Sequence, residues 1–150
     1  MTQQTYKILS INPGSTSTKI AVYENEVELF RKSVEHDVAE LSKYKYMVDQ
    51  FQMRKDAIMS CLAEANFSIA ELSAVAGRGG KLPPLKQGAY KVNKAMVNFL
   101  TYNPIDDHAS NLGAIIAYEI ASSLNIPSFI YDAVVVDELE DIARLSGTPE

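Results

Sequence analysis

A short run near the N-terminus combines the residue types that bind phosphate oxygens. The run reads Ile11-Asn12-Pro13-Gly14-Ser15-Thr16-Ser17-Thr18-Lys19. Gly14 to Thr18 are five consecutive small residues carrying four hydroxyl groups, and Lys19 adds a positive charge. Gly14 permits positive φ, so we expect a tight turn there with several N–H and O–H donors directed at one point. Such a donor set suits a phosphate group.

The same run also has an ordinary structural interpretation. Asn-Pro-Gly followed by Ser and Thr is common in hairpin turns. It is not a P-loop, because no second glycine precedes Lys19 and a predicted strand, rather than a helix, follows it. For the same reasons it lacks the glycine fingerprint of dinucleotide-binding folds. From the residues alone, a hairpin turn and a phosphate-binding loop both stay open.

A second glycine-rich stretch, Ala76-Gly77-Arg78-Gly79-Gly80, follows a short predicted strand. One interpretation is a glycine turn with a solvated arginine. The other is a site in which the glycines leave room for an anion and Arg78 clamps it. Arginine suits that role because its planar guanidinium forms bidentate bonds with phosphate or carboxylate.

His108 stands beside two carboxylates at the end of the predicted loop 103–108. One histidine with adjacent aspartates does not have metal-ligand spacing, so we do not expect a metal there. For Asp106, Asp107 and Ser110 the simpler prediction is that they cap the following helix.

Asp132 ends a predicted buried strand, Pro127-Ser128-Phe129-Ile130-Tyr131-Asp132. Open α/β sheets bind ligands at the carboxyl ends of their strands, so a functional carboxylate is expected at such a position. An aspartate at the end of a strand is also a common turn former. The residues alone leave both interpretations open.

These motifs, in this order, resemble the acetate kinase family. The loop Asn12–Lys19 on a hairpin looks like the first phosphate loop of that family and is most similar to that of its butyrate kinases. The later stretches that match in order are Ala76–Gly80, Asp107–Gly113 and Tyr131–Glu138. The resemblance spans essentially the whole chain, and four ordered motifs are far more specific than any one of them.

The resemblance implies a reaction: reversible phosphoryl transfer between ATP and butyrate, or a related short or branched fatty acid, to give acyl phosphate and ADP. It implies that Arg78 binds the carboxylate and that His108 contacts the transferred phosphoryl group. Asp132 corresponds to the catalytic acidic residue. Because a carboxylate substrate is already ionised near neutral pH, we expect Asp132 to position Arg78 or the metal rather than to remove a proton.

The resemblance also implies how ATP and Mg²⁺ are bound. The side-chain oxygen of Asn12 is expected near Mg²⁺, holding it through water in the ordinary manner of this hard cation. The phosphates of ATP are expected to contact Asn12, Gly14, Ser15, Thr16, Ser17 and Lys19.

Members of this family are considerably longer than this chain, and their second half carries the adenosine-binding loops. We therefore expect residues 1–150 to form an N-terminal domain of the acetokinase type, without the C-terminal nucleotide-binding domain, and to be inactive or nearly so alone. A homo-oligomer is expected at full length. Two alternatives are a sugar-kinase-type enzyme of the same actin-like superfamily and a non-catalytic domain that binds an anion or a partner protein.

The periodicity of apolar residues predicts the elements that position these residues. Strands are expected at 6–12, 17–24, 26–34, 74–76 and 127–132, and helices at 45–65, 93–100 and 112–124. Ser68 and Glu71 form a capping-box pattern, and Asp137 and Glu140 are expected to cap a last helix that stops at Gly147. Short connections require an antiparallel meander of the first three strands, and helical crossovers fit parallel strands. The predicted fold is α/β, with a mixed five-stranded sheet and flanking helices, which the resemblance makes a ribonuclease H-like domain of the actin-like ATPase type.

The composition is that of an ordinary globular chain of 150 residues, with 47% apolar and 22% charged residues. The net charge of −5 and the lack of a basic run argue against a nucleic-acid partner. The N-terminus lacks a signal-peptide pattern, and no apolar run is long enough for a membrane span, so a cytoplasmic chain without membrane association is expected. The single cysteine, Cys61, excludes an intrachain disulfide and is expected to be a buried, inert thiol.

Overall fold

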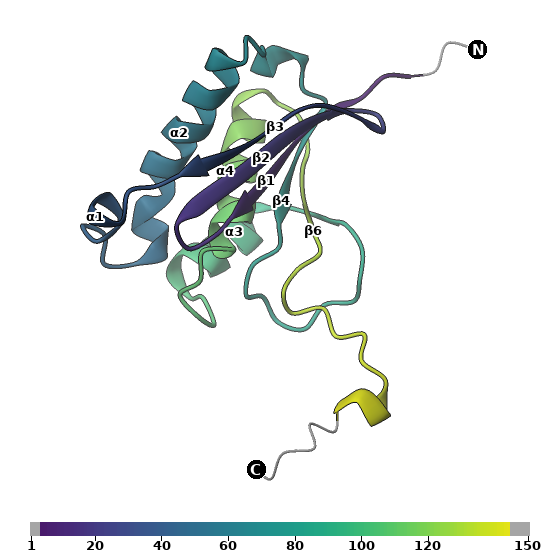
Figure 1. Cartoon of the computed structure of the whole chain (residues 1–150). Helices are drawn as coiled ribbons and strands as arrows, with labels where there is room; N and C mark the ends of the chain where they lie inside the picture. The colour runs from purple at the N-terminus through teal and green to yellow at the C-terminus, as the bar shows by residue number, and fades with distance from the viewer. Residues whose placement is uncertain (1–3, 145–150) are drawn as a thin grey trace.

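A mixed sheet runs through the computed structural model, which describes residues 4–144 (Figure 1). Within these residues the sheet has six strands in the order β3-β2-β1-β4-β6-β5. Their bounds are β1 (Lys7–Pro13), β2 (Ser17–Glu24), β3 (Val27–Glu35), β4 (Ala74–Arg78), β5 (Tyr90–Lys91) and β6 (Ser128–Tyr131). The first three strands form the expected antiparallel meander, and β1, β4 and β6 are parallel. The predicted five strands are one too few, because the short β5, for which no strand was predicted, pairs antiparallel with β6.

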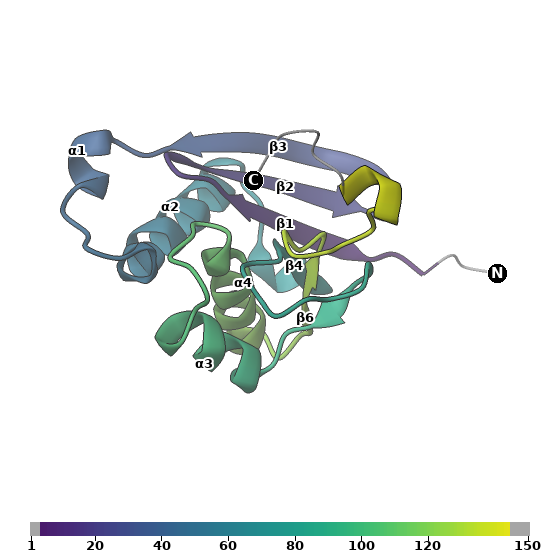
Figure 2. The ribbon, with the colours of Figure 1, turned by 90° about the horizontal axis from the view of Figure 1, so that it is seen from below.

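The helices are α1 (Val38–Leu41), α2 (Phe51–Glu64), α3 (Lys94–Tyr102) and α4 (Asn111–Ser123). Single 3-10 turns occur at Met47–Gln50, Ile69–Glu71 and Asp141–Arg144. Figure 2 shows α2, α3 and α4 on the same side of the sheet. The core lies between that side and the helices, with fully buried Leu9 and Ile11 from β1, Ile58 and Leu62 from α2, and Ile116 from α4. None of the helices in residues 4–144 is long and apolar enough to cross a lipid bilayer.

The helix predicted at 45–65 is split into a 3-10 turn and α2. Asn66, with a φ of 53°, follows the end of α2, close to the predicted helix end at residue 65. Ile58 and Leu62 of α2 are buried, whereas Ala65 is exposed and Arg54 is completely buried. The buried arginine has partners in the first hairpin, and a pattern of apolar residues cannot reveal them.

Several of the predicted helix caps are wrong. Ser68 precedes a 3-10 turn but makes no capping bond with its side chain. Glu71 instead forms an ion pair with Lys7 of β1. At the start of α4, Ser110 makes no side-chain cap either, because its hydroxyl bonds with the ring of His108.

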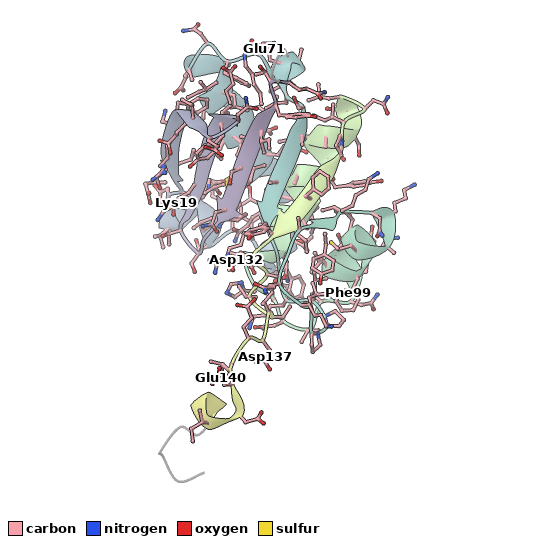
Figure 3. All side chains as sticks on the ribbon, turned by 90° about the vertical axis from the view of Figure 1, so that its right-hand side faces the viewer. Lys19, Glu71, Phe99, Asp132, Asp137 and Glu140 are labelled. Carbon is pink, nitrogen blue, oxygen red and sulfur yellow. The ribbon has the colours of Figure 1, made fainter. Side chains whose placement is uncertain are left out.

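The segment after β6 also differs from the prediction. Figure 3 shows Asp137 and Glu140 on a segment that leads away from the sheet. Asp137 accepts a hydrogen bond from the Leu139 N–H, and no α-helix follows as far as residue 144. The predicted helix end at Gly147 lies outside the described residues. Cys61 is buried as expected, and burial raises the pKa of its thiol.

Candidate functional site

The parallel strands β1, β4 and β6 end at the same edge of the sheet. Their register aligns Ile11 with Gly77 and Arg78 with Tyr131. As a result Asn12, Arg78 and Asp132 line one cavity of about 330 Å³. Asp132 directly follows β6, with a φ of 53°, and Figure 3 shows it where the chain leaves the sheet. This is the place where open α/β sheets bind ligands.

The first hairpin brings its polar residues to the same edge. Asn12 of β1 pairs with Lys19 of β2, and the Gly14 N–H donates to the Ser17 carbonyl at 2.7 Å. A second cavity, of about 220 Å³, is lined by Asn12, Gly14, Ser15, Ser17, Lys19, Arg78 and His108. The two cavities share Asn12 and Arg78. Of the predicted site residues only Thr16 lines neither cavity.

Gly14 does not use the conformational freedom expected of it. Among the glycines in residues 4–144, only Gly88 has positive φ. A Cβ on Gly14 would meet the Ser17 carbonyl oxygen at 3.4 Å, an ordinary contact. The turn is therefore closed by its hydrogen bond rather than by left-handed backbone.

One interpretation of the sequence was that the glycines around Arg78 leave room for an anion. In the structure the space beside these glycines is filled by other parts of the chain, so they allow close packing of the backbone instead. A Cβ on Gly77 would clash with the Gly113 carbonyl of α4. Added Cβ atoms on Gly79 and Gly80 would lie 2.5 Å from the Ala133 Cβ and the Asn111 Oδ1. These contacts hold the start of α4 against the end of β4, which brings His108 to the cavity that Arg78 lines.

His108 is exposed, and its ring is oriented by Ser110. The Ser110 N–H donates to His108 Nδ1 at 3.2 Å, and the Ser110 hydroxyl lies 2.7 Å from the same atom. With Nδ1 accepting, the proton of a neutral imidazole is on Nε2, where it is available to a ligand. The loop is held by Asn111, whose side chain donates to the Asp106 carbonyl and accepts from the Lys81 N–H, both at 2.8 Å.

Arg78 and Asp132 are both exposed, and no ion pair joins them in the described residues. Arg78 has no described side-chain partner, so its guanidinium is available to an anion. The same edge offers Asn12 as an oxygen ligand. No group of three or more His, Cys, Asp or Glu side chains within residues 4–144 could hold a metal ion. A hydrated Mg²⁺ bound mainly by phosphate oxygens would fit this arrangement, because Mg²⁺ needs few protein ligands.

A buried polar cluster behind the hairpin was not predicted from the sequence. Arg54 of α2 donates to the carbonyls of Ser15 and Ser17 at 3.0 and 3.1 Å, and to the Thr18 hydroxyl at 3.0 Å. Thr18 Oγ1 lies 2.8 Å from His36 Nε2. The one available signal was that Arg54 falls in the apolar stripe of its helix, four residues before Ile58.

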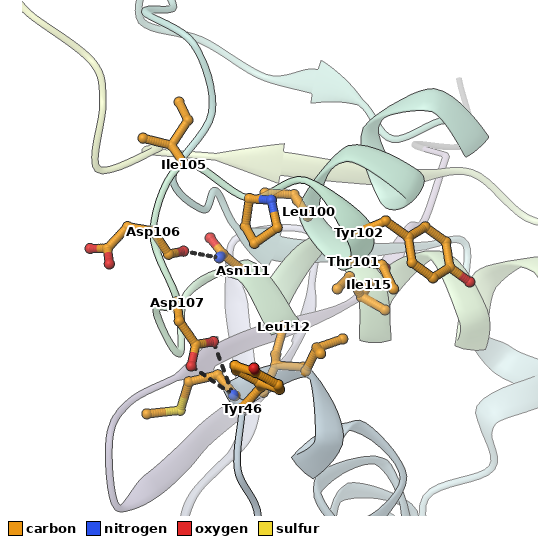
Figure 4. Close-up of a pocket in the computed structure, with 13 residues that line it drawn as sticks. Tyr46, Leu100, Thr101, Tyr102, Ile105, Asp106, Asp107, Asn111, Leu112 and Ile115 are labelled. Carbon is orange, nitrogen blue, oxygen red and sulfur yellow. Dashed lines mark hydrogen bonds between the residues drawn. The ribbon is translucent and has the colours of Figure 1, made fainter.

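Another cavity, of about 450 Å³, lies elsewhere (Figure 4). It is formed mainly by the 3-10 turn at Met47–Gln50, the end of α3, the loop 103–107 and the start of α4. Asp107, predicted to be a helix cap, instead accepts from the Met47 N–H there. This cavity contains Asp106 and Asp107 but no basic side chain, so it does not suit an anion. The smaller cavities at the strand ends form the candidate site.

Among known proteins, this chain has relatives with high sequence identity. The chain is 58% identical over 145 residues to the "Probable butyrate kinase" of Clostridium botulinum strain Eklund 17B, covering 97% of this chain and 41% of that protein. It is 51% identical over 142 residues to butyrate kinase 1 of Clostridium acetobutylicum, covering 95% and 40%. The chain thus spans about two fifths of the length of these relatives. No protein-family model matches it.

Solved structures agree on the fold. The acetate kinase from Porphyromonas gingivalis has a TM-score of 0.51 at 16% identity, covering 84% of this chain and 37% of that one. An exopolyphosphatase from Cytophaga hutchinsonii has a TM-score of 0.52 at 12% identity, covering 85% and 54%. The expected actin-like ATPase fold is confirmed. Over nearly its whole length, this chain is related by sequence to the butyrate kinases.

Proposed function

We propose that this chain is the N-terminal domain of a carboxylate kinase that transfers a phosphoryl group between ATP and butyrate or a related short or branched fatty acid. The observation that carries the proposal is the convergence of the first hairpin, Arg78 and His108 on one cavity. The butyrate kinase relatives support the choice of substrate class. A C-terminal domain, as in those longer relatives, would complete the nucleotide site.

The residues can divide the reaction among them. Arg78 binds the carboxylate and, beside it, Nε2–H of His108 donates to the oxygens of the transferred group. The hairpin and Lys19 hold the phosphates of ATP. A carboxylate oxygen forms a bond with the γ-phosphorus while the bond from that phosphorus to the oxygen of the ADP leaving group breaks, so no proton needs to be removed.

Asn12 would help to hold Mg²⁺ through water. When bound, Mg²⁺ would neutralise charge on the phosphate oxygens. Asp132 lines the cavity that Asn12 and Arg78 also line, and we assign it to orienting the hydrated cation or Arg78 in the substrate complex. We further propose a cytoplasmic location and a homo-oligomer at full length.

The test is a hydroxylamine trap for acyl phosphate with MgATP and a panel of short carboxylates. The chain is used alone and joined to the C-terminal part of butyrate kinase 1 of Clostridium acetobutylicum that the match does not cover. Butyrate-dependent hydroxamate from the joined protein is expected. Arg78→Ala should reduce it by a factor of about 10² to 10³.

Arg31→Ala is the matched control, because Arg31 is an exposed arginine on the edge strand β3, away from the cavities. Its hydroxamate yield should equal that of the unsubstituted protein. Sugar-dependent ATP hydrolysis would favour the sugar-kinase alternative. A joined protein that binds MgATP but phosphorylates no acceptor would favour a non-catalytic binding domain.

A further inference from the structure

Arg54 is a buried cation whose guanidinium bonds are all made to uncharged acceptors. Its side chain is 0% exposed. Nε and Nη2 donate to Gln50 Oε1 at 3.0 and 2.9 Å. The remaining bonds go to the Ser15 and Ser17 carbonyls and the Thr18 hydroxyl. These five bonds match the five N–H donors of the group.

No carboxylate in residues 4–144 forms an ion pair with Arg54. Burial lowers the pKa of Arg54, and burial and then the charge of Arg54 lower the pKa of His36. A buried charge is costly unless it is paired, so its retention without an acid needs a physical reason. Three of the five hydrogen bonds that Arg54 donates are to the first hairpin, so we look for the reason in that hairpin.

Arg54 holds that loop from behind. The Ser15 and Ser17 carbonyls turn inward to the guanidinium, and the Thr16 carbonyl accepts from the His36 N–H at 2.9 Å. In a trans peptide the carbonyl and the next N–H point in opposite directions. The N–H of Thr16 therefore points away from Arg54. Ser15 and Ser17 also line the cavity of about 220 Å³, which Arg54 does not line.

We propose that Arg54 is a positioning residue of the phosphate loop, and that an anion bound in front of the loop is the counter-charge of its guanidinium. The inference rests on the proposed function, in which this loop binds phosphate. Arg54 acts in two ways that can be separated. Its five donors fix the loop backbone, and its charge adds positive potential where the anion binds.

The experiment measures binding of inorganic tripolyphosphate to the ¹⁵N-labelled chain by NMR at low and high salt. Arg54→Met removes the charge, and Arg54→Lys keeps the charge without the planar fork. Lys55→Met is the matched control, because Lys55 follows Arg54 on α2 but pairs with Glu119 of α4 at 3.8 Å. Thermal unfolding of each variant reports whether it folds.

Arg54→Met should weaken tripolyphosphate binding by about tenfold or more at low salt, with a smaller factor at high salt. Arg54→Lys should recover part of that loss, and Lys55→Met should leave the affinity close to that of the unsubstituted chain. A folded Arg54→Met variant with unchanged affinity would overturn the inference and leave the proposed function intact.

If Arg54→Met does not fold, the role of the Arg54 charge can still be tested by NMR on the unsubstituted chain. The Arg54 Nε–H signal should shift on addition of tripolyphosphate with the same midpoint as the amides of residues 15–17. Movement of the loop amides without movement of Arg54 would contradict the role of its charge.

Absence of any tripolyphosphate response in the unsubstituted chain would contradict the proposed phosphate loop. In that case amide hydrogen exchange without ligand tests whether the donors of Arg54 fix the backbone of the loop. Exchange at residues 14–17 should be faster in Arg54→Lys than in the unsubstituted chain, and equal rates would overturn that part as well.

Discussion

At the scale of single residues, exposed and buried polar groups of the first hairpin have different roles. Ser15 and Lys19 are exposed and line the cavity. Thr18 and His36 are buried and connect the hairpin to Arg54. The exposed groups can bind a ligand, whereas the buried ones keep the loop in the shape that binding requires.

We expect His36 to make the fold sensitive to acid. Burial, and then Arg54, lower the pKa of His36 below its usual 6.5, with Glu35 opposing. Below about pH 6.5 the unfolded chain takes up a proton that the folded chain does not, so the free energy of unfolding falls as the pH falls toward the folded pKa. Above that pH this contribution is constant. Thermal unfolding at pH 7.5 and pH 5.5, about one unit either side of the ordinary histidine pKa of 6.5, measures the difference.

His36→Gln should reduce the loss of stability between the two pH values. The control is His108→Gln, which replaces the chain's other histidine, an exposed one. It should keep the pH dependence of the unsubstituted chain. An equal loss of stability in His36→Gln and the unsubstituted chain would show that His36 is not responsible.

At the scale of elements, the site depends on how closely α4 packs against β4. Gly77 and Gly113 let the two backbones touch at the point where β4 ends. Parallel pairing of β4 with β1 and β6 then aligns the strand ends. The packing of α4 against β4 therefore brings His108, which precedes α4, close to the first hairpin, although the two are far apart in the sequence.

Gly77→Ala should lower the free energy of unfolding by about 1–3 kcal/mol, because the added methyl group collides with the Gly113 carbonyl. The matched control is Gly14→Ala, since a Cβ there has only an ordinary contact and needs no positive φ. Its stability should change by less than about 0.5 kcal/mol. Urea unfolding measures both variants, and equal stability of Gly77→Ala and the unsubstituted chain would refute the close-packing argument.

At the scale of the whole molecule, the candidate site lies at one edge of the sheet and is open. Both cavities are formed by loops and strand ends. The related butyrate kinases are more than twice as long as the matched region. We propose that their additional part closes over this edge and holds the adenosine.

The chain alone should therefore make acyl phosphate more slowly than the joined protein, by about a hundredfold or more, because misplacement of the substrates by even a small distance is costly. The hydroxylamine assay compares the two proteins at equal concentration. Arg78→Ala in the chain alone distinguishes true residual turnover from contamination. Similar rates from the chain alone and the joined protein would show that residues 1–150 suffice.

The sequence by itself determined the strands of the meander, α3, α4 and the family resemblance. Apolar residues that alternate or recur every 3.6 residues indicate which face of a strand or helix is buried, and motifs of adjacent residues can be recognised in the sequence alone. The expected site residues other than Thr16 also come together at the cavities. The family resemblance, rather than the residue types alone, predicted this set, and the ends of the parallel strands explain the convergence of Asn12, Arg78 and Asp132.

Only the tertiary structure decided what these residues contact. Asp107 and Glu71 have the spacing of helix caps, but they bond with Met47 and Lys7, which are 60 and 64 residues away in the sequence. The glycines beside Arg78 accommodate α4, and Arg54 is buried because the first hairpin supplies its acceptors. Local preferences are worth about 1 kcal/mol each, so the need to satisfy the buried guanidinium of Arg54 with distant acceptors outweighs them.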